Sequence, residues 1–239
     1  MSATLNDPRI ANGMRAQMAL RRKHIDAGAK QIGWKVGMGA PPLKAKLNLT
    51  APIVGFLLDS APLPSGTTVS LKDWQKPVAE AEIAAYIGHD LPAGASRDTV
   101  RSAIAALGPA IELADVDCPM EDVEAVLSGD IFQRHVILGP RDTSRAGARL
   151  DGLSARVTRS GKDVPVPANL ETNIGEIVGI VRHVADVAAA LGDGLRAGHF
   201  IICGSLTAPL FLEPGETGVD FALESIGGPI GTISVRFST

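Results

Sequence analysis

The segment 77–87, PVAEAEIAAYI, constrains the fold more than any other part of the chain. It is apolar and partly β-branched, and a Pro and a Gly-His-Asp sequence border it, which predicts a β-strand. Because side chains alternate along a strand, Glu80 and Glu82 share one face, about 6.5 Å apart. Two carboxylates so close in an apolar segment oppose each other's ionisation and lose hydration. The pattern therefore favours a positive partner between them.

A hard divalent cation such as Mg²⁺ or Mn²⁺ fits this pair, because such ions take oxygen ligands and keep positions open for water or substrate. The alternative is an edge strand with one wet face, on which Glu80 and Glu82 would be ordinary surface residues. The pattern alone leaves both interpretations open.

Composition favours a single enzyme-sized domain. With 239 residues and 45% apolar content the chain can bury a large core. We expect one catalytic domain over residues 1–239, with a helical N-terminal portion at 1–50 packed on it. The net charge of −3 comes from interspersed acids and bases, and only 4% of the residues are aromatic, which argues against a nucleic-acid partner.

Targeting signals are missing from the sequence. The first residues lack a basic and an apolar leader region, and charge, Gly or Pro interrupts every long apolar run, so we expect no membrane association and a cytoplasmic location. Cys118 and Cys203 are 85 positions apart and match no metal or redox spacing. We interpret each as a core or pocket-wall residue.

Three further ionisable residues lie in apolar surroundings. Lys35 stands between Trp34 and Val36, where it either extends its charge outward or occupies a site that uses it. Asp59 closes the apolar run 53–59, at a predicted strand end. Glu112 lies in the middle of the predicted strand 108–117, where an ionisable residue is unusual.

Hydrophobic periodicity gives the remaining elements. Helices are predicted at 8–28, 43–47, 97–107, 120–128 and 175–191. Strands are predicted at 30–40, 53–59, 67–71, 77–87, 108–117, 131–138, 153–159, 164–166, 200–203, 209–212, 217–223 and 231–237. The first half is mixed and the second mainly β, which favours an α+β fold around a rolled mixed sheet rather than a βαβ array.

Other motifs give weaker signals. The glycines of 192–198 have the wrong spacing for a dinucleotide loop and follow a helix. None of the five histidines forms a paired metal motif. Ser205 lacks a visible base partner, so we interpret it as part of a turn that lines a pocket rather than as a nucleophile.

Several segments in order resemble the 2-oxo-4-pentenoate hydratase / 4-oxalocrotonate decarboxylase family, within the fumarylacetoacetate hydrolase superfamily. They span almost the whole chain and comprise Ile32–Gly37 (IGWKVG), Val54–Asp59 (VGFLLD), Pro77–Ala84 (PVAEAEIA), Pro109–Glu112 (PAIE), Leu191–Thr207 and the closing GTISVRF. The resemblance implies the mixed β-roll of the superfamily's C-terminal domain with peripheral helices, assembled as a homo-oligomer, a dimer or larger, either alone or with a partner enzyme of the same pathway.

The resemblance also implies roles for particular residues. The metal-binding carboxylates carry over to Glu80, Glu82 and Glu112, with Mg²⁺ or Mn²⁺ as the cofactor. Lys35 and Asp59 become the catalytic pair, Lys35 transferring a proton and Asp59 orienting it or the attacking water. A cation beside a partly buried Lys35 would lower the pKa of its ammonium. The turn of Ser205, Leu206 and Thr207 is implied to bind substrate.

Two departures from the family pattern leave the reaction open. The chain has Gly129-Asp-Ile-Phe-Gln-Arg134 where the family has a small polar stretch, and Gly198-His where the family has Gly-Asp. Arg134 and His135 are the added basic residues, and strand alternation would send them to opposite faces. We predict hydration of a 2-oxopent-4-enoate-like acid in aromatic meta-cleavage catabolism. The alternatives are decarboxylation of a 2-oxo-enedioate, and a non-catalytic subunit that binds a 2-oxo acid or a partner.

Overall fold

The predicted strand at 77–87 is β5 (Pro77–Ile87), and it lies at the centre of the larger of two sheets. The computed structural model describes residues 3–226 and 228–238. β5 pairs antiparallel with β6 (Ile104–Asp115) on one side and with β10 (Phe200–Ser205) on the other. It is therefore a central strand, and the edge-strand alternative is wrong.

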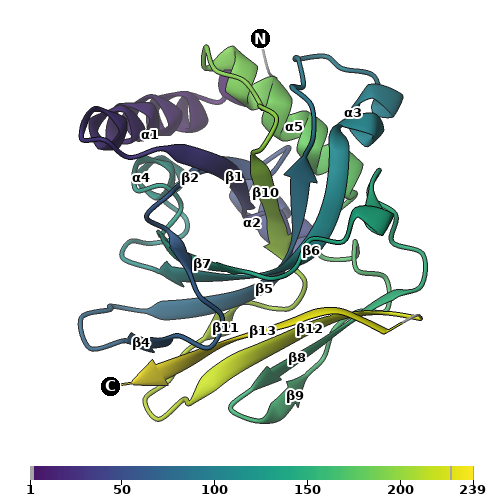
Figure 1. Cartoon of the computed structure of the whole chain (residues 1–239). Coiled ribbons are helices and arrows are strands. Elements are labelled where there is room, and N and C mark those ends of the chain that lie inside the picture. Colours follow the sequence, from purple (N-terminus) through teal and green to yellow (C-terminus); the bar gives the residue numbers. More distant parts are fainter. Residues whose placement is uncertain (1–2, 227, 239) are drawn as a thin grey trace.

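The larger sheet has eight strands and curls around its concave face (Figure 1). The order along it is β2-β1-β10-β5-β6-β7-β3, with β11 pairing to β5 off this path. Its remaining strands are β1 (Gln31–Gly37), β2 (Ile53–Leu58), β3 (Pro62–Leu63), β7 (Gln133–Leu138) and β11 (Leu210–Phe211). Parallel pairs, such as β1 with β10, occur beside antiparallel ones, so the sheet is mixed as predicted.

A second sheet of five strands lies beside the first, in the order β4-β13-β12-β8-β9 (Figure 1). Its strands are β4 (Thr68–Ser70), β8 (Leu153–Arg159), β9 (Lys162–Val164), β12 (Gly218–Ser225) and β13 (Gly228–Ser238). Val219, Phe221 and Leu223 of β12 are fully buried, while Asp220 and Glu224 on its other face are partly exposed. This alternation buries one face of the sheet and leaves the other to solvent.

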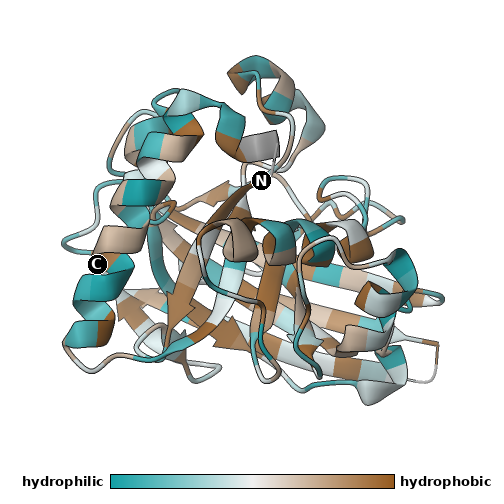
Figure 2. Ribbon diagram, turned by 90° about the horizontal axis from the view of Figure 1, so that it is seen from above, coloured by the Kyte–Doolittle hydropathy of each residue, from teal (hydrophilic) through white to brown (hydrophobic). Residues whose placement is uncertain are grey.

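Helices cover the outside of the larger sheet. They are α1 (Pro8–Asp26), α2 (Pro41–Leu47), α3 (Arg97–Ala103), α4 (Val123–Ser128) and α5 (Ile177–Ala190), with 3-10 turns η1 (Ala3–Asn6) and η2 (Thr143–Arg145). α1 packs against α4, where a Cβ on Gly13 would lie 2.6 Å from Leu127 Cβ. Figure 2 shows polar residues on the helices and hydrophobic strands beneath them. No helix of the described residues is long and apolar enough to cross a membrane.

Three element predictions need correction. The strand predicted at 164–166 is β9 at Lys162–Val164, two residues earlier. The helix predicted at 97–107 ends at Ala103, because the β-branched Ile104 begins β6 and pairs with Ile87 of β5. The strand predicted at 131–138 begins only at Gln133. Asp130, Ile131 and Phe132 have positive φ and form a left-handed turn before it. The α+β class is confirmed.

Candidate active site

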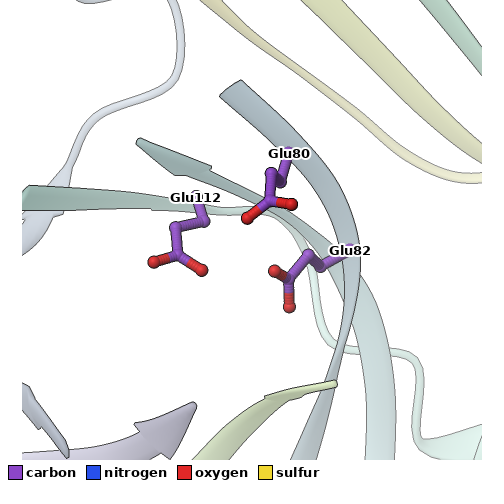
Figure 3. Close-up of side chains that lie close together, drawn as sticks. All are labelled: Glu80, Glu82 and Glu112. Atoms are coloured by element: carbon purple, nitrogen blue, oxygen red, sulfur yellow. The ribbon is translucent and has the colours of Figure 1, made fainter. Parts of the chain in front are cut away.

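Three glutamates from two neighbouring strands meet on the concave face of the larger sheet (Figure 3). Glu80 of β5 lies directly opposite Glu112 of β6 in the antiparallel register, and Glu82 follows two residues along β5 on the same face. One carboxylate oxygen from each lies within 4.8 Å of the others. Glu82 and Glu112 are each 1% exposed and Glu80 is partly buried, so the structure brings the three predicted metal ligands together.

This cluster concentrates negative charge where water is scarce. Burial, followed by repulsion from Glu112, raises the pKa of Glu80 to about 7. Burial likewise raises the pKa of Glu82 well above its usual range, with Glu112 and Glu80 adding to the effect. Glu82 Oε2 accepts a hydrogen bond from the Gly204 N–H at 2.7 Å. Its Oε1 has no hydrogen-bond partner in the described part of the chain, so one buried acceptor is available for a ligand.

Lys35 supplies the nearest positive charge. Its side chain is buried, its ammonium pairs with Glu112, and Nζ donates to the Ile131 carbonyl oxygen at 2.9 Å. Burial alone would lower the pKa of Lys35, but attraction to Glu112, and then to Asp130 and Glu80, outweighs it and raises the pKa. The predicted fall in the pKa of Lys35 concerns a lysine beside a bound cation and stays a prediction. The lysine is a buried ammonium rather than an outward-extending side chain.

The structure does not bring Asp59 to Lys35. Asp59 is exposed just beyond the end of β2, where its Oδ1 accepts the Lys30 N–H at 3.0 Å. Lys35 pairs across the strands with Gly55, and Asp59 lies four residues further along, about 13 Å away in an extended chain. The strand that carries Asp59 thus runs away from the carboxylates, and the pairing of Asp59 with Lys35 needs correction.

Asp130 occupies the neighbourhood of Lys35 that the sequence prediction gave to Asp59. It is 6% exposed, and its Oδ1 accepts the Phe56 N–H at 2.9 Å. Burial raises the pKa of Asp130 well above its usual range, although the charge of Lys35 opposes the rise. The sequence analysis missed this residue. The signal that could have found it was its place in the segment that departs from the family pattern.

The turn at Ser205, Leu206 and Thr207 borders the cluster. Ser205 pairs with Glu82 across β10 and β5, and its buried hydroxyl has no partner among residues 3–226 and 228–238. The Leu206 N–H donates to Ala81 O at 2.8 Å, which holds the turn against β5. Thr207 is buried and donates its hydroxyl to Ala208 O. Of the two hydroxyls, that of Ser205 is the one beside Glu82 without a protein partner.

The two basic residues of the departing segment are engaged elsewhere. Arg134 Nη2 lies 3.3 Å from Asp115 Oδ2, and Asp115 alternates with Glu112 along β6 to face the other side of the sheet. His135 lies opposite Leu113, also on that side, and its ring lies 6.2 Å from that of Trp74. A register shift between Leu113 and Ala114 interrupts the alternation that predicted opposite faces for Arg134 and His135.

Residues 23–234 match the model of the fumarylacetoacetate (FAA) hydrolase C-terminal family, and the chain belongs to that family. The chain is 29% identical over 220 residues to a 2-hydroxyhexa-2,4-dienoate hydratase of Comamonas testosteroni, covering 89% of this chain and 80% of the relative. It is 27% identical over 233 residues to a 4-oxalocrotonate decarboxylase of Pseudomonas putida, covering 95% of this chain and 85% of the relative.

Solved structures give the same assignment. The 4-oxalocrotonate decarboxylase from Pseudomonas putida G7, complexed with magnesium and adipate, superposes with a TM-score of 0.83 at 25% identity, covering 100% of this chain and 90% of the other. A fumarylpyruvate hydrolase from Pseudomonas aeruginosa, in complex with Mn²⁺ and pyruvate, has a TM-score of 0.66 at 15% identity. The likeness covers 87% of this chain and 89% of the other. The latter likeness supports the fold alone. The resemblance noted from the sequence is confirmed.

Proposed function

We propose that this protein is a divalent-metal-dependent hydratase of a 2-oxopent-4-enoate-like acid in the meta-cleavage catabolism of aromatic compounds. One observation carries the proposal: three carboxylates converge within 4.8 Å beside a buried lysine, in a chain related to hydratases and decarboxylases. A small 2-oxo acid is the substrate class that such a site serves.

The residues present fit a Mg²⁺ or Mn²⁺ ion. Glu80, Glu82 and Glu112 offer only oxygen donors, which hard divalent cations prefer. The buried Oε1 of Glu82 has no other partner among the described residues. A dication would offset the burial and the mutual repulsion that raise the pKa values of Glu80 and Glu82. When bound, the ion supplies positive charge against the negative charge that develops on the 2-oxo group.

Lys35 is the proton-transfer group in this proposal. Its ammonium is held between Glu112 and the Ile131 carbonyl, so its proton-bearing Nζ has a fixed place at the edge of the cluster. Ser205 pairs with Glu82 across β10 and β5, and its hydroxyl, which has no partner among the described residues, can donate to the substrate there. A lysine that only clamps the substrate carboxylate would affect KM instead of kcat.

Hydration is favoured over decarboxylation by the position of the basic residues. A 2-oxo-enedioate carries a second carboxylate at its far end, and a positive group nearby would help to bind it. Arg134 is paired with Asp115 and His135 packs near Trp74, both on the face opposite Glu112. A substrate whose distal end is an uncharged alkene does not need either group.

Decarboxylation of a 2-oxo-enedioate is the second candidate. The similarity to a 4-oxalocrotonate decarboxylase along the whole chain, with a TM-score of 0.83, favours it. A non-catalytic subunit that binds a 2-oxo acid is the third. We also propose a cytoplasmic homo-oligomer, by itself or with a partner enzyme of the pathway, as the family resemblance implies; light scattering of the purified protein measures the assembly.

The test is a panel of 2-oxo-alkenoates and 2-oxo-enedioates incubated with the protein and Mg²⁺, followed by ultraviolet absorbance, CO₂ release and product identification. The hydratase proposal predicts a 4-hydroxy-2-oxo acid from the alkenoate. CO₂ without a hydrated product would contradict it in favour of the decarboxylase. Thermal shifts with 2-oxo acids but no spectral change would identify a binder.

A further inference from the structure

The turn between α4 and β7 has an unusual backbone. Asp130, Ile131 and Phe132 have φ values of 59°, 54° and 63°, a left-handed conformation that non-glycine residues, and β-branched ones above all, adopt at a cost. Hydrogen bonds hold the turn at both ends. The Ile131 N–H donates to Val126 O at 2.8 Å, and Phe132 O accepts the Asp115 N–H at 3.0 Å.

This backbone directs two acceptors toward the interior. The Ile131 carbonyl oxygen accepts a hydrogen bond from Lys35 Nζ at 2.9 Å. The Asp130 carboxylate accepts the Phe56 N–H at 2.9 Å and lies against Gly55, the residue that pairs with Lys35 across β1 and β2, so its charge and that of Lys35 influence each other. An extended backbone at these residues would turn the carbonyl of Ile131 away.

Two glycines on the adjoining strands make room for the turn. A Cβ on Gly55 would lie 2.7 Å from Asp130 Oδ1 and 2.9 Å from Lys35 Cγ. A Cβ on Gly37 would lie 2.7 Å from Ile131 Cγ2. A side chain at either position would therefore collide with the same turn, so the turn packs closely against β1 and β2 beside Lys35.

We propose that Asp130 is the positioning residue for Lys35: the left-handed turn of Asp130, Ile131 and Phe132 places the Ile131 carbonyl against the lysine and the Asp130 carboxylate near it, and so fixes its ammonium beside Glu112. Asp130 thus has the role of orienting Lys35 that the sequence analysis had predicted for Asp59, which lies exposed beyond the end of β2. The competing interpretation is that Asp130 only accepts the Phe56 N–H and links α4 to β7. The expected effect of Asp130 on kcat rests on the proposed function, whereas the expected coupling between Asp130 and Lys35 in the stability of the protein does not.

A double-mutant cycle on the metal-free protein, kept in chelator, tests the coupling. Asp130→Asn keeps the size and an acceptor for the Phe56 N–H, and removes only the charge. We expect its effect on the unfolding equilibrium constant to differ by at least about tenfold between the two backgrounds, less favourable to the folded state when Lys35 is present than in Lys35→Met. An equal change in both backgrounds would overturn the proposal.

Asp115→Asn is the matched control. Asp115 is also a buried aspartate that accepts backbone N–H groups, from Gln75 and Lys76, but it faces the opposite side of the sheet. Its effect should be the same with Lys35 or Met at position 35. If Asp130→Asn does not fold, Asp130→Ser runs the same cycle, because its hydroxyl is neutral and still accepts a hydrogen bond.

Kinetics with the 2-oxo acid that the wild-type protein turns over provide the second readout. A positioning role predicts a fall in kcat of at least about tenfold for Asp130→Asn, with KM within about threefold. An unchanged kcat would overturn the proposal. If the wild-type protein turns over no 2-oxo acid, the proposed function fails, and the metal-free cycle still decides the role of Asp130.

Discussion

The two sheets of this protein carry acidic residues in different ways. β5 of the larger sheet is buried on both faces around Glu82, whereas in β12 of the smaller sheet Asp220 and Glu224 alternate with buried apolar residues. Asp220 meets Arg236 across the strands near solvent. Within residues 3–226 and 228–238, Lys35 is the cation that balances the carboxylates of β5 inside the sheet. Charge on an alternating strand is ordinary, and charge within a doubly buried strand indicates a site.

Lys35→Met is the change with the largest expected effect, because it removes the positive charge from the cluster. We expect kcat to fall about 10²- to 10⁴-fold, the range for loss of a proton-transfer group, while metal binding is retained. Steady-state kinetics and a parallel Mn²⁺ titration measure this. A raised KM with kcat nearly intact would instead make Lys35 an electrostatic clamp.

A substitution in the core of the smaller sheet should lower the stability of the protein and leave its kcat unchanged. Phe221 of β12 is fully buried in the core. Phe221→Ala should lower the free energy of unfolding by about 3–5 kcal/mol, through lost burial and the cavity left behind. Denaturant unfolding measures the loss, and kcat per folded molecule should stay unchanged. A large fall in kcat at a temperature where the variant is folded would show that the two sheets are coupled.

An added methyl group near the glutamate cluster should lower the free energy of unfolding by less than Phe221→Ala does. Gly55→Ala places a methyl group 2.7 Å from Asp130 Oδ1, and we expect a loss of about 1–3 kcal/mol in the free energy of unfolding together with reduced kcat. Gly39→Ala is the control, because its nearest neighbour would be Pro52 Cγ at 3.5 Å, an ordinary contact. Equal tolerance of both substitutions would contradict the close packing around Asp130.

Arg134→Ala should have the smallest effect. Its guanidinium is half-exposed, and Asp115 keeps the N–H groups of Gln75 and Lys76, so the loss should be about 1 kcal/mol or less. Because Arg134 points away from Glu112, kcat/KM for an alkenoate should remain within about twofold. A selective loss of activity toward a 2-oxo-enedioate would indicate that Arg134 contacts the substrate and would support decarboxylation as the function.

Strand periodicity was enough to place Glu80 and Glu82 on one face, because alternation is a local property of the backbone. It could not bring in Glu112, whose partner depends on the register of β5 with β6; the family resemblance supplied that residue. The elements were predictable where hydrophobic patterns were long, as in β5 and α5. At 97–107 the helical pattern continues into residues that belong to β6. The helix ends at Ala103 because Ile104 pairs with Ile87 of β5, which local periodicity does not indicate.

The exchange of Asp59 for Asp130 has a different cause. Asp59 looked suitable because it closes an apolar run, but strand direction carries it to the surface. Asp130 is brought near Lys35 by a turn of three consecutive left-handed residues, of which the other two are Ile131 and Phe132. Neither residue type favours that conformation, so no local propensity indicates it, and only the surrounding packing makes it possible.

Binding of Mn²⁺ to the purified protein tests the central claim most directly. We expect one ion per chain, lost or strongly weakened in Glu82→Gln and unchanged in Glu224→Gln, a strand glutamate of the smaller sheet. Titration calorimetry with the chelator-treated protein measures both stoichiometry and affinity. Wild-type protein that binds no Mn²⁺ or Mg²⁺, or Glu82→Gln that binds as the wild type does, would contradict the assignment of the three glutamates as a metal centre.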